Sequence, residues 1–206
     1  MNDRHGVFVS YYHEQDQKYR DLFEKLFSDV YDIMESKSVE IGNIDPNIKT
    51  ETVYQKIRDE HLRHSTVTVV LIGAKTWQRK YVDWEISSSL RDTKSNSRSG
   101  LIGILLPTYP ASADVYERLA IEYIRPVSQI TKTFRYNLYT IPPRLYDNLD
   151  DNPDRSYATL HKWSENPSEV QRWIQNAYRK RKSKTILPNN SRKLFAKNRK
   201  GEGWSE

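Results

Sequence analysis

The chain has 206 residues, which is enough for one ordinary domain but not for two large ones. It contains no cysteine, so disulfides, thiolate zinc sites, iron–sulfur clusters and a cysteine nucleophile are excluded. The net charge is +6, but the ten Lys and Arg and two Glu from Arg179 onward give that end +8, so the rest carries −2. No apolar run approaches the ~20 residues of a membrane span, and we expect a cytoplasmic protein.

Hydrophobic patterning alternates strands with helices along the chain. Strands are predicted at residues 6–10, 30–33, 66–72, 101–106 and 157–163. Helices are predicted at residues 16–29, 51–63 and 77–91, with a long loop at 35–50 and no clear pattern over 108–152. The alternation predicts an α/β fold with a five-stranded parallel sheet and helices on both faces. The short connections favour the flavodoxin-like strand order 2-1-3-4-5.

The last helix has the clearest start signal. Asn166 is a suitable N-cap, Pro167 fits the first turn and Glu169 stands at the capping-box position. After Lys182 the helical pattern ends, so the sequence predicts a domain over 1–182 and a basic C-terminal tail over 183–206. Such a tail can bind nucleic acid or an anionic membrane. It lacks regularly interleaved aromatic residues for base stacking, however, which favours a solvated end.

Several kinds of site are excluded by missing motifs. The seven glycines form neither a dinucleotide-binding fingerprint nor a P-loop, and no zinc-protease or serine-hydrolase motif occurs. His61 and His64 are three residues apart but have no third ligand nearby, so no metal site is predicted.

The remaining candidate is a carboxyl group on the helix after the third predicted strand. In the expected strand order, ligands bind at the carboxyl ends of strands one and three. On that helix Val82 and Ile86 define the core face, and Glu85 lies about 60° to one side. Trp77 and Tyr81 lie along the same side. An acid flanked by aromatic residues could bind sugar hydroxyls, but the same pattern is typical of an ordinary glutamate at the edge of an amphipathic helix.

Short motifs along the chain resemble those of TIR domains. The opening Val7–Tyr12, followed by Asp16, is similar to their first motif, in which an apolar strand ends in Ser-Tyr before an acid. Residues 66–72 and 77–86 resemble their third strand and catalytic helix. Residues 141–146, 160–163 and the helix of Trp173 are similar to bacterial TIR-like proteins, most closely to the TIR protein (ThsB-like) of the Thoeris anti-phage system. The resemblance covers residues 6–182.

The resemblance implies a set of site residues. Enzymatic TIR domains carry a helical Trp-x-x-x-Glu motif, whose glutamate is catalytic. Here Glu85 occupies the position of the glutamate, and Tyr81 replaces the tryptophan. The substrate-binding residues implied by the resemblance are Ser10, Tyr11, Tyr12, Trp77 and Tyr81. Asp32 and the loop after it would stand where TIR domains carry a loop that completes an active site between subunits.

The resemblance also implies the reaction and its partners. NAD would be the substrate, with no cofactor and no metal, and cleavage of its nicotinamide–ribose bond would release nicotinamide. The other product would be an ADP-ribose-derived signal, cyclic or conjugated, that reaches a separate effector. A homo-oligomer and a phage-derived trigger fit this interpretation, and neither a membrane nor nucleic acid is expected as a partner.

Two other interpretations remain open. The first is a non-catalytic TIR-like adaptor that self-associates and recruits partners, for which Glu85 would be dispensable. The second is a nucleotide- or nucleic-acid-binding module that uses the basic end from Arg179 onward, with salt-dependent binding. The sequence leaves open the exact product, the trigger and the oligomeric state.

Overall fold

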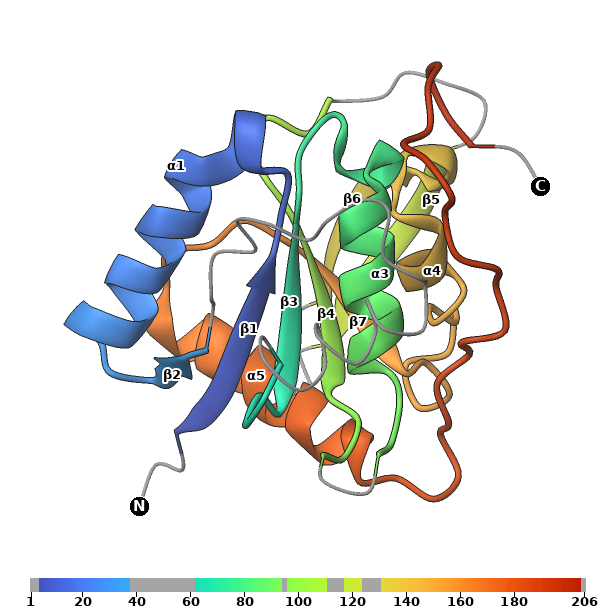
Figure 1. Ribbon diagram of the computed structural model, residues 1–206. Helices are drawn as coiled ribbons and strands as arrows, with labels where there is room; N and C mark the ends of the chain where they lie inside the picture. The colour runs from blue at the N-terminus through green and yellow to red at the C-terminus, as the bar shows by residue number, and fades with distance from the viewer. Residues whose placement is uncertain (1–3, 38–61, 94–95, 111–116, 124–130, 205–206) are drawn as a thin grey trace.

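A five-stranded parallel sheet forms the centre of the protein (Figure 1). The computed structural model describes residues 4–37, 62–93, 96–110, 117–123 and 131–204. The strand order is β2-β1-β3-β4-β7, and every neighbouring pair is parallel. The strands are β1 (His5–Ser10), β2 (Met34–Ser36), β3 (Val67–Ile72), β4 (Gly100–Leu105) and β7 (Ala158–Lys162). The predicted flavodoxin-like architecture and strand order are therefore confirmed.

Helices cover both faces of this sheet. They are α1 (His13–Glu24), α3 (Lys80–Ser89), α4 (Pro143–Tyr146) and α5 (Pro167–Arg181). A π-helical turn at Lys25–Val30 extends α1, and 3₁₀ turns lie at Thr76–Gln78 and Leu138–Thr140. Helices α1 and α5 pack on one face, and α3 and α4 pack on the other. Among the described residues, no helix has the length and apolar character needed to cross a membrane.

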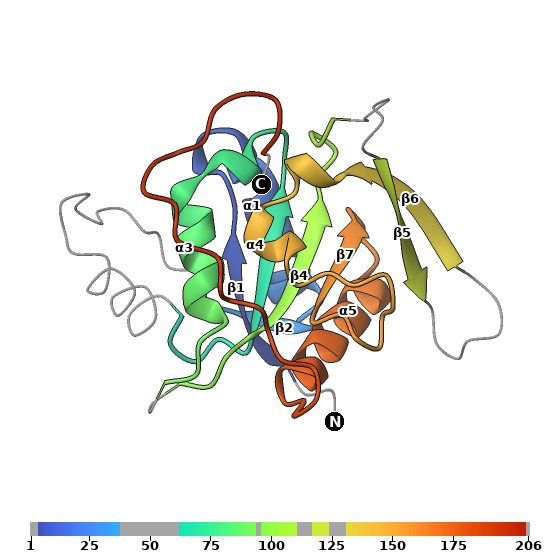
Figure 2. The same ribbon diagram turned by 90° about the vertical axis from the view of Figure 1, so that its right-hand side faces the viewer.

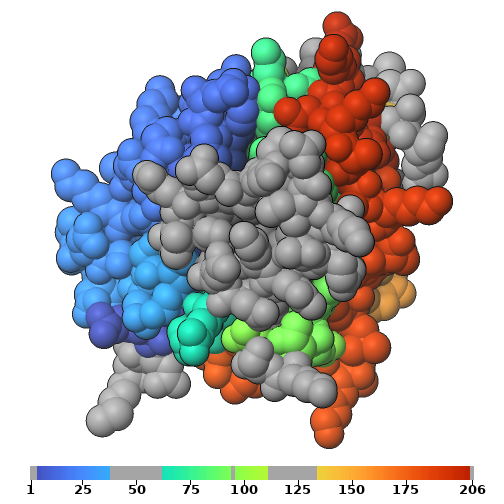
Figure 3. Space-filling view, viewed as in Figure 1, coloured from blue at the N-terminus to red at the C-terminus, as the bar shows by residue number. Residues whose placement is uncertain are grey.

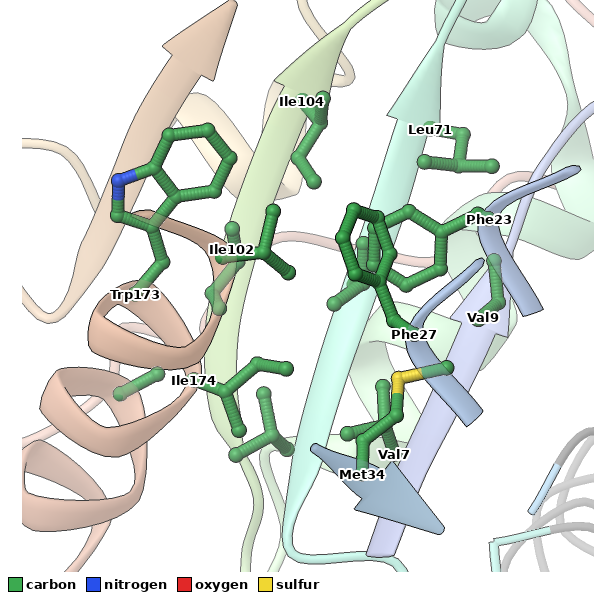
Figure 4. Packing of buried hydrophobic residues seen from close by; sticks show 14 of the residues in the cluster. Val7, Val9, Phe23, Phe27, Met34, Leu71, Ile102, Ile104, Trp173 and Ile174 are labelled. Carbon is green, nitrogen blue, oxygen red and sulfur yellow. The ribbon is translucent and has the colours of Figure 1, made fainter. Parts of the chain in front are cut away.

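The larger hydrophobic core lies between the sheet and the α1–α5 layer (Figure 4). Phe23 and Phe27 meet edge to face, with ring centres 4.8 Å apart, and Trp173 and Ile174 enter from α5. The sheet contributes alternate residues of its central strands, such as Val69 of β3. The burial of both faces explains why the central strands read as continuous apolar runs rather than as alternating ones.

The second core lies between the sheet and the α3–α4 layer. Val70 and Ile72 of β3 point to this side and pack with Val82 and Ile86 of α3. All residues from 82 to 90 are buried, although the segment includes an aspartate, a glutamate and three serines. Helix α3 therefore has polar side chains on surfaces that are covered by protein rather than by water.

The second strand lies later in the chain than predicted. The helical segment continues through the π-helical turn to Val30, which is 59% exposed, and Asp32 then adopts φ 52°. Aspartate tolerates this left-handed conformation better than most residues, and here it reverses the chain. The prediction of a strand over 30–33 was wrong, because the strand starts at Met34 after this reversal.

Two helix boundaries also differ from the prediction. The helix predicted over 77–91 is divided: Trp77 lies in a 3₁₀ turn, Arg79 is extended, and α3 begins at Lys80. The first helix starts at His13 rather than at residue 16. Of the helix predicted over 51–63, residues 51–61 lie outside the described residues, and Leu62 and Arg63 are not helical.

The region without a clear sequence pattern contains a β-hairpin. Strands β5 (Glu117–Tyr123) and β6 (Thr131–Asn137) pair antiparallel as a separate two-stranded sheet. Figure 2 shows the hairpin extending from the body beside β7. Helix α4 follows within the same region and covers part of the sheet.

The start of α5 is confirmed in detail. The Asn166 side chain accepts hydrogen bonds from the backbone N–H groups of Ser168 and Glu169, at 3.0 and 3.4 Å. The Glu169 carboxylate accepts from the Ser164 hydroxyl, which in turn accepts from the Asn166 N–H at 3.2 Å. Ser164 thus links the two ends of the expected capping box.

Residues 189–204, which we call the C-terminal strap, contain no helix or strand and run beside α3 and α4 (Figure 1). Phe195 and Trp204 are buried, and the Trp204 indole N–H donates to the Ile141 carbonyl at 2.7 Å. Arg192 forms a bidentate ion pair with Asp147, directly after α4. The space-filling view shows the strap, in red, as part of one side of the molecule (Figure 3). The division of the chain at residue 182 stays a prediction.

Candidate functional site

The candidate site lies where β1 and β3 end side by side. Strands β2 and β3 flank β1 on opposite sides, so the order of the chain through the sheet reverses at β1. In open parallel sheets, ligands bind at the carboxyl ends of the strands at such a point. Ser10 is the last residue of β1, and Gly73 directly follows β3.

Ser10 and Glu85 are brought into direct contact. The Ser10 hydroxyl donates to Glu85 Oε2 at 2.5 Å. Both side chains are buried, with 1% and 3% of their surface exposed. Along β1, Phe8 also faces the α3 side, whereas Val7 and Val9 face α1 and α5. The alternation of side chains along a strand therefore directs Ser10 toward α3.

The Glu85 carboxyl group is buried without a compensating positive charge from the described residues. Burial raises the pKa of Glu85 to about 8, and the hydrogen bond from Ser10 opposes this rise. Among the residues that the structure describes, no Lys or Arg pairs with Glu85. A buried acid of this kind is neutral at low pH and becomes a strong electrostatic partner when a positive charge approaches.

The two tyrosines after Ser10 lie in different environments. Tyr11 belongs to the core on the α1–α5 side, where its hydroxyl donates to Gln17 at 2.6 Å and burial raises its pKa to about 12. Tyr12 precedes α1, and the guanidinium carbon of Arg79 lies 3.7 Å from its ring centre. The structure therefore places Tyr12 beside the start of α3 and Tyr11 on the other side of β1.

The other two predicted aromatic residues are also separated. Trp77 is buried in the 3₁₀ turn before α3. Tyr81 is partly buried and meets Trp84 edge to face, with ring centres 5.5 Å apart, in the cluster of Phe8 and Leu62. Of the predicted site residues, only Ser10 contacts Glu85 through a hydrogen bond that the described part of the chain shows, and the binding roles stay predictions.

A second buried carboxyl group at this edge was not assigned a role from the sequence. Asp16 of α1 is 1% exposed, and its two oxygens accept from the hydroxyls of Thr76 and Thr108, each at 3.3 Å. These threonines follow β3 and β4, so Asp16 joins three strand ends. A Cβ added to Gly73 would lie 2.4 Å from Asp16 Oδ1. Asp16 was visible in the sequence only as the acid that follows the Ser-Tyr pair.

The chemistry of this site rests on the buried Glu85 carboxyl group and the Ser10 hydroxyl beside it. Across the described ranges, no group of three or more His, Asp or Glu side chains is arranged to hold a metal. A buried carboxyl group with a hydroxyl beside it can bind polar hydrogens of a ligand. In its ionised form it can also stabilise positive charge that develops on that ligand.

Comparison with known families adds an independent observation. Residues 8–110 match a family model described as Thoeris protein ThsB, TIR-like domain. The match covers half of the chain and runs from β1 through β4, so it includes Ser10, Asp16 and Glu85. A search of curated proteins found no match.

Proposed function

Since the chain belongs to the family of Thoeris ThsB TIR-like domains, we propose that it is an enzyme of anti-phage defence that cleaves the nicotinamide–ribose bond of NAD. The observation that carries this proposal is the buried Glu85 carboxyl group, hydrogen-bonded by Ser10 at the carboxyl end of β1. It lies at the edge of the sheet where this fold binds ligands.

The reaction places positive charge close to this carboxyl group. As the bond between ribose C1′ and the nicotinamide nitrogen breaks, the bonding electron pair leaves with nicotinamide and neutralises its pyridinium ring. The ribose becomes an oxocarbenium-like cation, which is the charge problem that glycosidases solve with carboxylates. The neutral leaving group departs without help from a metal ion, and NAD is the substrate rather than a cofactor.

Glu85 changes its protonation state during this cycle. Without substrate, burial favours the neutral acid, since its pKa is raised to about 8. The positive ring of NAD favours the carboxylate, because an opposite charge within ~4–6 Å lowers the pKa of an acid. Glu85 therefore releases its proton to solvent as NAD binds, and the carboxylate then stabilises the ribosyl cation and accepts hydrogen bonds from the ribose hydroxyls.

The product is a cyclic or conjugated ADP-ribose. A nucleophile attacks C1′ on the face that nicotinamide leaves, and it loses its proton to solvent where it carries one. An adenine nitrogen of the same molecule gives a cyclic product, a second metabolite gives a conjugate, and water would give linear ADP-ribose. We propose that this signal acts in the cytoplasm on a separate effector after a phage-derived trigger.

The test is to incubate concentrated protein with NAD and to analyse the products by mass spectrometry. Wild type is compared with Glu85→Gln, which keeps the size and the hydrogen-bonding capacity of the side chain. Glu165→Gln, an exposed glutamate before α5, is the matched control. We expect nicotinamide from wild type and Glu165→Gln, and a loss of about 10³-fold in Glu85→Gln.

The second product identifies the nucleophile by its mass. If the purified protein releases no nicotinamide, the assay is repeated in lysate of phage-infected cells, which supplies a trigger. Inactivity there, together with undiminished anti-phage protection by Glu85→Gln, would overturn the proposal and favour the adaptor.

A further inference from the structure

A buried ion pair holds α3 on the side away from Glu85. Asp83 of α3 and Arg144 of α4 are 3% and 1% exposed. Arg144 Nε donates to Asp83 Oδ1 at 2.9 Å, and Arg144 Nη2 donates to Oδ2 at 3.3 Å. Removing either partner of such a pair leaves an uncompensated buried charge, so the pair fixes the position of α3 relative to α4.

The C-terminal strap makes further hydrogen bonds with both members of this pair. The backbone N–H of Phe195 donates to Asp83 Oδ2 at 3.0 Å. Arg144 Nη1 donates to the Asn190 side-chain oxygen at 2.8 Å, and Arg144 Nη2 donates to the Lys193 carbonyl at 3.3 Å. The ion pair therefore joins three segments: α3, α4 and the strap.

The strap also contacts α3 directly along its length. Asn190 and Ser87 exchange two hydrogen bonds: the Ser87 hydroxyl donates to Asn190 Oδ1 at 3.0 Å, and Asn190 Nδ2 donates to the Ser87 carbonyl at 2.9 Å. The Trp84 indole N–H donates to the Phe195 carbonyl at 2.9 Å. The Lys80 N–H at the first turn donates to Asn198 Oδ1 at 2.9 Å. Successive turns of α3 are thus held by one segment.

The contacts of Asp83 and Ser87 lie on the opposite side of α3 from the candidate catalytic residue. Asp83 and Glu85 are two residues apart and therefore point about 200° apart around the helix axis. On the sheet side, α3 is held by apolar contacts of Val82 and Ile86, which are not directional. Directional contacts of α3 in the described part of the chain include the Ser10–Glu85 hydrogen bond on one side and the hydrogen bonds to the strap on the other.

We propose that the Asp83–Arg144 pair and the hydrogen bonds that the C-terminal strap makes with α3 and with this pair are positioning elements for Glu85, which set the rotation and depth of α3 so that Glu85 meets Ser10 in the site. This inference deepens the proposed function and rests on it for the catalytic role of Glu85. The environment of Glu85 can be followed through the titration of its carboxyl group, which does not depend on NAD cleavage.

The test uses full-length point variants and two readouts. Arg144→Met removes the cation of the pair, and the milder Asn190→Ala removes the contacts of this side chain with Ser87 and Arg144. The control is Arg192→Met, which breaks a bidentate ion pair of the same strap, but with Asp147 rather than with α3. Near-ultraviolet circular dichroism verifies that each variant is folded.

The first readout is the titration of the Glu85 side-chain carboxyl carbon by ¹³C NMR, assigned by its absence in Glu85→Gln. We expect its midpoint to fall from near 8 toward 4.5 in Asn190→Ala, because a displaced α3 admits water to the carboxyl group. The second readout is kcat/KM for NAD. We expect a loss of about 10²-fold in Arg144→Met, as for a reacting group misplaced by about 1 Å. Arg192→Met should leave both readouts unchanged.

The outcomes separate this inference from the proposed function. A midpoint and a kcat/KM that stay at wild-type values in folded Asn190→Ala would overturn the positioning role, as would equal shifts in Arg192→Met. If wild type cleaves no NAD but the Glu85 midpoint still moves in Asn190→Ala and not in Arg192→Met, the positioning role stands and the proposed function fails.

Discussion

Asp83 and Glu85 are two carboxyl groups of one helix with equal burial and opposite surroundings. Each has 3% of its surface exposed. Asp83 meets the fork of Arg144 and a backbone N–H, so its charge is matched and its hydrogen bonds are made. Glu85 meets only the Ser10 hydroxyl among the described residues.

The difference shows that burial alone does not identify a functional acid. Desolvation penalises the charged form of any carboxyl group, but a neighbouring cation cancels the penalty. Asp83 has that cation in Arg144 and has a structural role, since it connects α3 to α4 and the strap. Glu85 has no such cation within the described part of the chain, so its site can gain energy from a positively charged ligand, which is what the proposed reaction requires.

The largest effect is expected in the pH dependence of stability. Folding raises the pKa of Glu85 from 4.5 to about 8. Between pH 4.5 and 8, therefore, this side chain is ionised in the unfolded chain and protonated in the folded one. This group therefore lowers the stability of wild type as pH rises through this window, by about 4–5 kcal/mol in total. Urea unfolding at pH 4 and 8.5 should show this change in wild type relative to Glu85→Gln. A constant difference between the two proteins would contradict it.

A slightly smaller effect on stability is expected when the Asp83–Arg144 ion pair is broken. Arg144→Met leaves Asp83 buried with the Phe195 N–H as its remaining partner among the described residues, and should cost about 3–4 kcal/mol of unfolding free energy. The double variant Asp83→Leu/Arg144→Met removes both charges and should cost less than the single one. The double variant still loses some stability, because the strap groups that bonded to the pair, such as the Phe195 N–H, lose these hydrogen bonds. Urea unfolding at pH 7 measures both, and a double variant less stable than the single one would contradict the charge argument.

A third buried carboxyl group gives an intermediate effect. Asp16 lies against the backbone of Gly73, where an added methyl group would come within 2.4 Å of a carboxylate oxygen. Gly73→Ala should therefore destabilise the protein by about 2 kcal/mol, as expected for overpacking. In a double-mutant cycle with Asp16→Ala, the clash disappears and a coupling energy of similar size should result. Additive effects would show that the contact is unimportant.

The smallest effect concerns the hydrogen bond of Glu85. The Ser10 hydroxyl lowers the pKa of Glu85 against the larger effect of burial, so Ser10→Ala should raise it further. Loss of this hydrogen bond destabilises the ionised form of Glu85 by about 1.5 kcal/mol. The rising limb of kcat/KM for NAD against pH, which reports the free enzyme, should then move to higher pH. Ser164→Ala, a hydroxyl before α5, is the control, and an equal shift in that variant would refute the assignment.

Much of the fold was predictable because local patterns and global burial agree. The strand 66–72 and the N-cap at Asn166 were read correctly, since a β-branched run and a capping side chain are local signals. The second strand was misplaced because the reversal at Asp32 depends on a backbone conformation that composition does not specify. Likewise, Arg79 interrupts the predicted helix by adopting an extended conformation.

The site was only partly predictable, for a different reason. Periodicity placed Glu85 beside the core face of its helix, but its burial depends on packing around α3 that comes from distant parts of the chain. The role of Asp83 was equally invisible, because its partner Arg144 is 61 residues away. A contact over such a separation leaves no local pattern.

The large separation between α3 and its strap also has a consequence for the order of synthesis. Ser87 and Asn190 are 103 residues apart, and Asp83 and Phe195 are 112 apart. A ribosome adds about 5–20 residues per second, so α3 waits for seconds before its last hydrogen-bonding partners emerge. A nascent chain with the complete β1–β4 core still lacks them. Under the proposed positioning role, a nascent chain that ends before residue 190 does not yet hold Glu85 in its active position.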